Sequence, residues 1–299
     1  MIVPFNAAGR KPPFYFIHGL IGLMPLGQFL ATNLGEDQPL QVLHAEGMDG
    51  RADARFPRTA LEMAELYADQ IQQTGPSGPI VVGGMCKGAL AAIEVAQALR
   101  NRGADIRAVI LADPPAQAGR SASPGFSKHL EDPNFIAHLG KRVRAQLEIH
   151  AGFPYNTMPF DMNDAGSLDM AVRAGVRCMS ALDIHMPKPY AGDVMAIMTP
   201  QRAPGFFQPN MYWMSSLADL RLTQVVPCNH LELFQSARHE LVRALQYLLS
   251  QAFSERPAPD RNTLPDTHAF GDLDTFEPSR DMPITELFRK KARRLLGER

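Results

Sequence analysis

The chain has few cysteines, almost no excess charge and no long apolar run. Its 299 residues include three cysteines, Cys86, Cys178 and Cys228. This odd, widely spaced set predicts neither a disulfide framework nor a zinc site, and we expect no metal. The 30 basic and 31 acidic side chains leave a net charge of −1, which gives no overall basic field for binding nucleic acid. The longest apolar runs are strand-length, so we expect no membrane-spanning segment.

The composition is that of a globular protein. Hydrophobic residues make up 45% of the chain and charged residues 20%, which excludes a disordered chain. Met1 to Pro13 contain no apolar run ending in small residues, so a secretory signal is not expected. We therefore expect a globular, cytoplasmic protein.

In the first half, short apolar runs alternate with segments of helical period. The runs are nearly continuous in hydrophobicity, as in strands covered on both faces. Thr59, followed three residues later by Glu62, predicts a capping box at the start of a helix that ends near Gly75. A helix rich in Ala and Leu is expected at Gly88–Leu99. Strands are expected at Phe14–Ile17, Leu40–Ala45, Pro79–Val82 and Ile106–Ala112. This alternation predicts an α/β fold with a mostly parallel sheet.

The pattern changes after Asp113. Strand-like runs are absent from there to about Pro189, and residues 116–185 are expected to form a helical insertion resting on the sheet. Its helices are expected at Asn134–Ala151 and Leu168–Ile184, followed by strands at Val194–Met198 and Leu220–Val226 and an amphipathic helix from about Leu233 to Phe253. Prolines punctuate residues 254–299, which predicts an extended arm. We expect domains at 1–253 and 254–299. The arm's basic end fits a solvated or oligomer-docking extension, or a surface for an acidic partner protein.

One motif carries most of the chemical signal. After the strand at Pro79–Val82, the chain reads Gly84-x-Cys86-x-Gly88 and then continues as a helix. This is the nucleophile-elbow pattern with Cys in place of the usual Ser. The side chain at its centre projects from a strained turn, and the two glycines let strand and helix approach closely. The helix N-terminus favours a thiolate and a nearby oxyanion. We therefore expect Cys86 to be the nucleophile.

A thiol nucleophile needs a base, and the base needs an orienting acid. In elbow folds the order along the chain is nucleophile, acid, histidine. Asp113 directly follows the strand Ile106–Ala112, and His230 follows the strand Leu220–Val226. Both are therefore expected at the sheet edge that carries Cys86. The alternatives are that Asp113 only initiates a turn before Pro114 and that His230 is structural.

Backbone N–H groups are expected to complete the site as an oxyanion hole. The candidates are the N–H groups of Leu20, in the loop that begins at His18, and of Lys87. The His18 side chain is expected to be structural. The Lys87 side chain either lowers the thiol pKa of Cys86 or is an inert surface group. Cys178 and Cys228 are expected to be packing residues.

These residues resemble a known family. Phe14 to Pro115 is similar to the thioesterase domains of nonribosomal peptide and polyketide synthases, and Asp113 follows Cys86 by 27 positions, as is typical there. The matching segments are His18-Gly19, Glu46–Gly50, Glu62–Ile71, the elbow, Leu111–Asp113, Tyr190–Val194 and His230. The chain resembles stand-alone members of this family. The resemblance implies an α/β-hydrolase fold with residues 116–185 as a lid. It also implies an acyl or peptidyl carrier protein as partner, with the substrate on its phosphopantetheine and no cofactor in this chain. The arm has no counterpart.

The departure from the family is Cys for Ser. A thioester on Cys86 keeps the acyl group activated, which suits an enzyme that passes it onward in natural-product biosynthesis. We therefore expect acyl, aminoacyl or peptidyl transfer. A Dieckmann cyclase releasing a tetramate or pyridone and a hydrolytic, editing thioesterase are the alternatives of the same class. A non-catalytic carrier-binding module and an esterase or lactonase for small molecules are alternatives of other classes.

Overall fold

The computed structural model describes residues 1–51, 53–115, 132–200 and 220–254. The chain divides into two units, Met1–Ala252 and Phe253–Arg299. In the second unit the described residues are Phe253 and Ser254. Nearly all of the expected arm thus lies outside the described residues, and its extended form stays a prediction.

A mostly parallel sheet forms the centre of the first unit. In the described part of the chain it has seven strands in the order β1-β3-β2-β4-β5-β6-β7. Every neighbouring pair is parallel except β1 and β3, which run antiparallel with Ile2 opposite Leu43. The strands are β1 (Ile2–Phe5), β2 (Phe14–Ile17), β3 (Leu40–Leu43), β4 (Ile80–Met85), β5 (Ile106–Ala112), β6 (Val194–Met198) and β7 (Leu220–Val225). The expected parallel sheet is confirmed, but β1 was not foreseen, because Pro4 interrupts its apolar run and a proline argues against a strand except at a sheet edge, where β1 lies.

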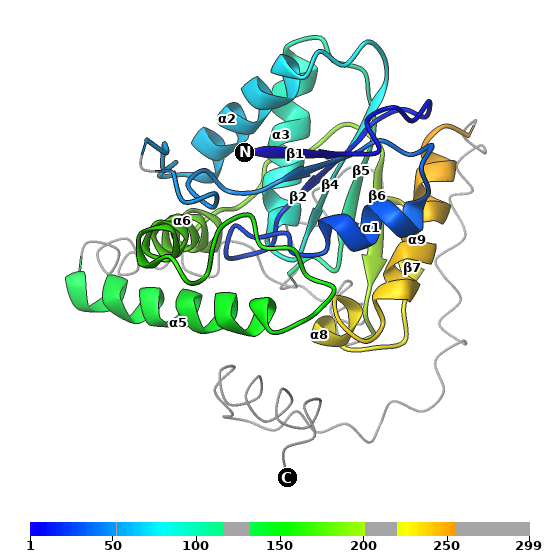
Figure 1. Ribbon diagram of the computed structural model, residues 1–299. Coiled ribbons are helices and arrows are strands. Elements are labelled where there is room, and N and C mark those ends of the chain that lie inside the picture. Colours follow the sequence, from blue (N-terminus) through cyan, green and yellow to red (C-terminus); the bar gives the residue numbers. More distant parts are fainter. Residues whose placement is uncertain (52, 116–131, 201–219, 255–299) are drawn as a thin grey trace. The chain divides into compact units, whose positions relative to one another are not determined.

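Helices cover both faces of the sheet (Figure 1). Alternate strand residues point to opposite faces, so Tyr15 and Ile17 pack in one core while Phe14 and Phe16 pack in the other. The first face is covered by α2 (Ala60–Gln73) and α3 (Gly88–Asn101), and the second by α1 (Gly27–Leu34) and α9 (Arg238–Ala252). The strands are apolar throughout because both of their faces are buried.

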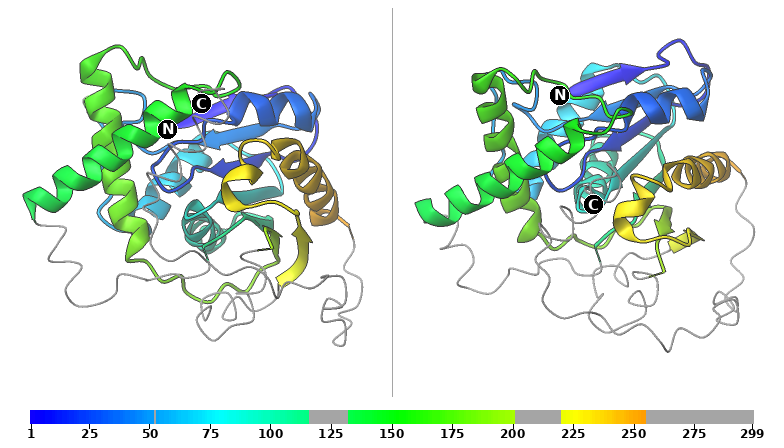
Figure 2. Two further views of the ribbon diagram at one scale, coloured as in Figure 1. Left: turned by 90° about the horizontal axis from the view of Figure 1, so that it is seen from below. Right: turned by 60° about the horizontal axis from the view of Figure 1, so that its bottom comes forward.

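Two helices of the expected insertion lie at the carboxyl ends of the strands. They are α5 (Pro133–Ala151) and α6 (Ala165–Asp183), which cross one another in the view from below (Figure 2). Asp132 and Asp164 cap them by accepting hydrogen bonds from Asn134 N–H and Ser167 N–H. Their apolar sides form a third core with Ile21 and neighbouring residues. The two expected helices of the insertion are confirmed, with α6 beginning three residues before the expected Leu168, and residues 116–131 lie outside the described residues.

The end of the first unit differs from the prediction of one long helix. The structure has a short helix, α8 (His230–Leu233), a turn, and then α9. Asn229 starts α8 because its side chain accepts from the N–H groups of Leu231 and Glu232, and the Glu232 carboxylate accepts from Asn229 N–H. This capping box places His230 at the first helical position. None of the described helices is both long and apolar enough to cross a membrane.

Candidate active site

Cys86 stands on the sharp turn between β4 and α3. Its φ of 52° is in the left-handed region, which a non-glycine residue seldom occupies. A Cβ added to Gly84 would lie 2.3 Å from the Gly88 carbonyl oxygen, and one added to Gly88 would lie 1.7 Å from the His18 carbonyl oxygen. Strand, helix and the His18 loop therefore meet at a distance that only glycine permits. The strained turn is present as the motif predicts.

Asp113 directly follows the neighbouring strand β5, at the same height along the sheet as Cys86. Met85 pairs with Ala112 across β4 and β5, and Cys86 N–H donates to the Ala112 carbonyl oxygen at 2.8 Å. Cys86 and Asp113 are thus the first residues beyond two adjacent strands. Asp113 also has a positive φ, 47°, and its side chain is fully buried. Its place at the sheet edge follows from the parallel topology.

His230 and Asp113 are brought together although 117 positions separate them. The distance from His230 Nδ1 to Asp113 Oδ2 is 2.5 Å. Because a carboxylate only accepts, the ring donates from Nδ1, which leaves Nε2 of the neutral ring as an acceptor. The His230 side chain keeps 24% of its surface exposed and packs edge-on against Phe234. The arrangement is that of an acid orienting a base.

Thr199 is a residue of this site that the sequence reasoning missed. Its N–H donates to Asp113 Oδ1 at 2.8 Å and its hydroxyl donates to the same oxygen at 3.1 Å. Both groups are buried, so they stabilise the charged carboxylate where water does not reach. Thr199 directly follows β6, the strand beside β5. A hydroxyl residue directly after the strand beside β5 was the sequence feature from which this role could have been predicted.

The loop expected to supply an oxyanion donor lies against the elbow. The His18 carbonyl contacts Gly88, as described above, and a Cβ on Gly19 would lie 3.6 Å from the Met85 side chain. The loop backbone therefore borders the residues on both sides of Cys86. The role of the Leu20 and Lys87 N–H groups as oxyanion donors stays a prediction.

The Lys87 side chain is not a surface group. Its Nζ pairs with the carboxylate of Asp183, the last residue of α6, and only 19% of the side chain is exposed. Further along α3, the buried Glu94 carboxylate bonds His185 Nε2 at 2.9 Å. The inert-surface alternative for Lys87 is therefore wrong. Its charge holds the end of a lid helix against the elbow.

The other two cysteines have the environments of packing residues. Cys178 is 1% exposed, and burial raises the pKa of its thiol well above the ordinary value. Cys228 packs against the core of α9, and burial, with the charges of Glu232 and Asp113, raises the pKa of its thiol to about 11. Both thiols are protonated near neutral pH, which makes them poor nucleophiles.

The fold and the elbow place the chain in the α/β-hydrolase class. Among solved structures, the NocB thioesterase domain from the nocardicin cluster aligns with 83% of this chain and 98% of its own, with a TM-score of 0.60 and 22% identity. The wild-type Vlm2 thioesterase domain covers 84% of this chain and 97% of its own, with a TM-score of 0.58 and 20% identity. These likenesses establish the fold.

Sequence comparisons narrow the class. Residues 28–150 match the family model of the thioesterase domain. A dimodular nonribosomal peptide synthase of Bacillus subtilis (strain 168) is 31% identical over 38% of this chain and 5% of its own length. Atromentin synthetase of Tapinella panuoides is 31% identical over 40% of this chain and 12% of its own. The chain thus spans a small fraction of these relatives. Over this part of the chain the sequence is similar to the thioesterase domain family and to nonribosomal peptide synthetases.

Proposed function

We propose that the chain is a thioesterase-like acyltransferase that takes an acyl, aminoacyl or peptidyl group from a carrier-protein thioester onto Cys86. The observation that carries the proposal is the buried Asp113 carboxylate bound to His230, one strand away from a cysteine on a strained elbow. Similarity to the thioesterase domain family and to nonribosomal peptide synthetases supports the substrate class.

The first half-reaction loads Cys86. His230 Nε2 takes the proton of the thiol, and the sulfur attacks the thioester carbonyl carbon. The N–H groups of Leu20 and Lys87 stabilise the negative oxygen of the tetrahedral intermediate. The bond to the pantetheine sulfur then breaks, and that sulfur leaves as a thiol with the proton from His230. Asp113 stabilises the imidazolium that exists between these two proton transfers.

The second half-reaction moves the acyl group from Cys86 to an acceptor. His230 removes a proton from the acceptor, which attacks the acyl-enzyme carbonyl, and the same proton returns to the Cys86 sulfur as it leaves. The acceptor is a carrier thiol in transfer, water in editing hydrolysis, and a carbanion of the acyl chain in a Dieckmann cyclisation. We favour transfer, because exchange between two thioesters is nearly thermoneutral and keeps the acyl group activated.

The lid helices α5 and α6 are proposed to select the acyl group. They stand over the carboxyl ends of the strands, where all three residues of the Cys86, Asp113 and His230 set emerge. Their apolar sides pack in the core that includes Ile21, which fixes both helices against the loop after β2 that borders the elbow.

A single turnover with a loaded carrier protein tests the proposal. An acyl-phosphopantetheinyl carrier is mixed with the protein and a second, empty carrier, and all species are weighed by intact mass spectrometry. Transfer moves the acyl mass to the second carrier, hydrolysis releases an acid, and cyclisation releases a ring. Equal rates with a simple ester and with the carrier thioester identify an esterase instead. Carrier binding with no acyl movement identifies a binding module.

A further inference from the structure

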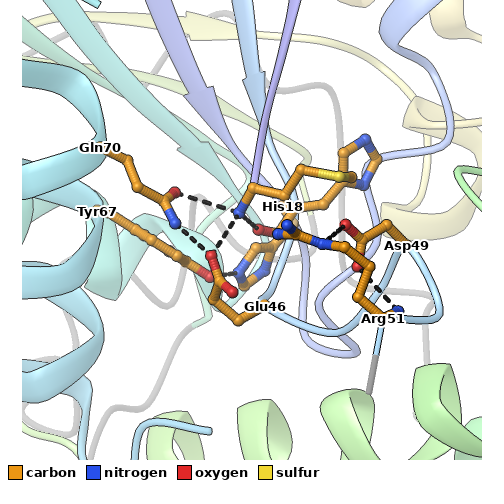
Figure 3. Close-up of polar contacts among 8 residues, drawn as sticks. His18, Glu46, Asp49, Arg51, Tyr67 and Gln70 are labelled. Carbon is orange, nitrogen blue, oxygen red and sulfur yellow. Dashed lines mark hydrogen bonds and ion pairs between the residues drawn. The ribbon is translucent and has the colours of Figure 1, made fainter. Parts of the chain in front are cut away.

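His18 is a fully buried polar residue beside the elbow, and the mechanism above makes no use of it. Its ring lies next to Tyr67 of α2 and Cys178 of α6. Figure 3 shows its ring pointing at Tyr67 of α2, with the two joined by a hydrogen bond. Both ring nitrogens are hydrogen-bonded, and a fully satisfied buried polar network makes its surroundings rigid.

The two ring bonds define the proton positions. Nδ1 lies 2.7 Å from the Gly19 carbonyl oxygen, which only accepts, so Nδ1 carries the proton and donates it. Nε2 lies 2.5 Å from the Tyr67 hydroxyl. Burial lowers the pKa of His18 to about 4, so the ring is neutral at working pH and Nε2 accepts from Tyr67. The sequence of bonds runs from Tyr67 O–H to the ring and from the ring to Gly19.

The Gly19 carbonyl is held from a second side. Gly22 N–H also donates to it, at 3.2 Å. In a trans peptide the C=O of one residue and the N–H of the next point in opposite directions. Fixing the Gly19 oxygen toward the His18 ring therefore fixes the Leu20 N–H away from the ring. Within the described residues no acceptor is assigned to that N–H.

We propose that His18, held by Tyr67, is a positioning residue that aims the Leu20 N–H at the oxygen of the reacting carbonyl. The proposal rests on the acyl-transfer function argued above. It extends that function by assigning the oxyanion donor's orientation to a buried side-chain pair, His18 directly after β2 and Tyr67 of α2. The loop's contacts with Met85 and Gly88 keep its backbone beside Cys86, and the His18 ring sets the rotation of one peptide within it.

Cys178 also contacts the His18 ring and supplies a control for the two ring hydrogen bonds. Its sulfur lies 3.7 and 3.8 Å from Nδ1 and Nε2 of the same ring. Because Nδ1 and Nε2 are already committed to Gly19 and Tyr67, the thiol is a packing neighbour that sets no peptide orientation. Cys178→Ala is therefore a matched control that opens space beside His18 without removing either bond.

The test compares two replacements of His18 that each keep one nitrogen position. In His18→Asn the side-chain amide takes the Nδ1 position and can still donate to Gly19. In His18→Gln the amide takes the Nε2 position and that donor is lost. Pre-steady-state acylation of Cys86 by an acyl thioester is measured beside its alkylation by iodoacetamide, which develops no oxyanion. We expect His18→Gln to lower kcat and the acylation rate by roughly tenfold to a hundredfold. KM and alkylation should stay near wild type.

The remaining variants keep the outcomes separate. His18→Asn and Cys178→Ala should retain acylation within a few-fold of wild type, and Tyr67→Phe, which keeps the ring in place of the tyrosine, should fall between. If His18→Gln does not fold, Tyr67→Phe carries the same comparison. Acylation of His18→Gln at the wild-type rate, or an equal loss in alkylation, overturns the positioning role alone. Absence of acylation in the wild type overturns the proposed function and this role with it.

Discussion

At the residue scale, the site depends on which polar atoms hold the Asp113 carboxylate. Oδ2 accepts from His230, while Oδ1 accepts from the N–H and hydroxyl of Thr199. The carboxylate is buried, so each of these donors replaces a hydrogen bond that water would otherwise supply. The charge that orients His230 is therefore stabilised by a residue that need not touch substrate.

Replacement of Thr199 by valine tests this role. Thr199→Val keeps the shape of the side chain but removes the hydroxyl donor, and hydrogen bonds to charged groups contribute about 1.5–3 kcal/mol. We expect kcat to fall about tenfold with little change in KM. The acidic limb of the kcat–pH profile should also move, because the carboxylate is less well stabilised. Thr199→Ser, which retains the donor, should restore both, and a profile unchanged in Thr199→Val contradicts the role.

Sequence reasoning located Asp113 and His230 but not Thr199. The first two are recognisable because nucleophilic chemistry requires an acid and a base in a fixed order after strands. Thr199 has no such requirement: another donor from another strand could hold Asp113 equally well. The His18–Tyr67 pair could not be predicted for a similar reason, since it joins a residue directly after β2 to one on α2, 49 positions apart. Residues that take part in the chemistry can be predicted from their type and order along the chain. Residues that only position them depend on how the chain packs, which the sequence pattern does not show.

At the element scale, the site is created by the close approach of β4, α3 and the loop after β2. Gly84 and Gly88 make that approach possible, as the near contacts with Gly88 and His18 backbone atoms show. These contacts are with backbone atoms, which cannot move aside by changing a side-chain rotamer. An added methyl group must displace the strand, the helix or the loop.

Gly88→Ala is therefore expected to destabilise the fold strongly. Overpacking a filled site costs about 1–3 kcal/mol, and this contact with backbone should lie at the upper end. Gly78→Ala is the matched control, because nothing lies within 4 Å of a Cβ at that position. Urea unfolding followed by circular dichroism measures both. A Gly88→Ala protein as stable as Gly78→Ala contradicts the close approach described for the elbow.

The elements themselves were predictable to different degrees. Phe14–Ile17, Ile106–Ala112 and Val194–Met198 were predicted with the bounds that the structure has, because buried parallel strands are continuous apolar runs. The last helix was predicted to begin near Leu233, whereas α9 begins at Arg238 and the short helix α8 before it was not predicted. The hydrogen bonds of Asn229 that start α8 do not alter the apolar period from which the last helix was predicted.

At the scale of the whole molecule, two buried histidines, His18 and His44, and the half-buried His150 make stability depend on pH. Burial lowers the pKa of His18 and His150 to about 4 and that of His44 to about 3, against an ordinary value of 6.5. Residues around them add to the effect: His18 lowers the pKa of His44, and the Met1 ammonium lowers both. In the folded state all three are neutral between pH 4.5 and 6.5, while in the unfolded state they gain protons.

The free energy of unfolding should therefore fall as the pH drops from 6.5 toward 4. Near pH 5 unfolding takes up about three protons, and each histidine contributes on the order of 3 kcal/mol over the window. The lowered pKa values of Asp37 and Asp164 act only below pH 3.8. Urea titrations at pH 7, 6 and 5 give the slope. His150→Gln should reduce this slope by about one proton, and a flat profile refutes the account.

The central claim is that one thiol of three carries the acyl group, and the most direct measurement is the mass of the acyl-enzyme. The protein is quenched in acid during turnover of an acyl-loaded carrier, weighed intact and mapped by peptide digestion. The account predicts a single added acyl mass on Cys86. It is retained in Cys178→Ala and Cys228→Ala and absent in Cys86→Ala. An adduct that persists in Cys86→Ala, or that maps to another residue in the wild type, would contradict it.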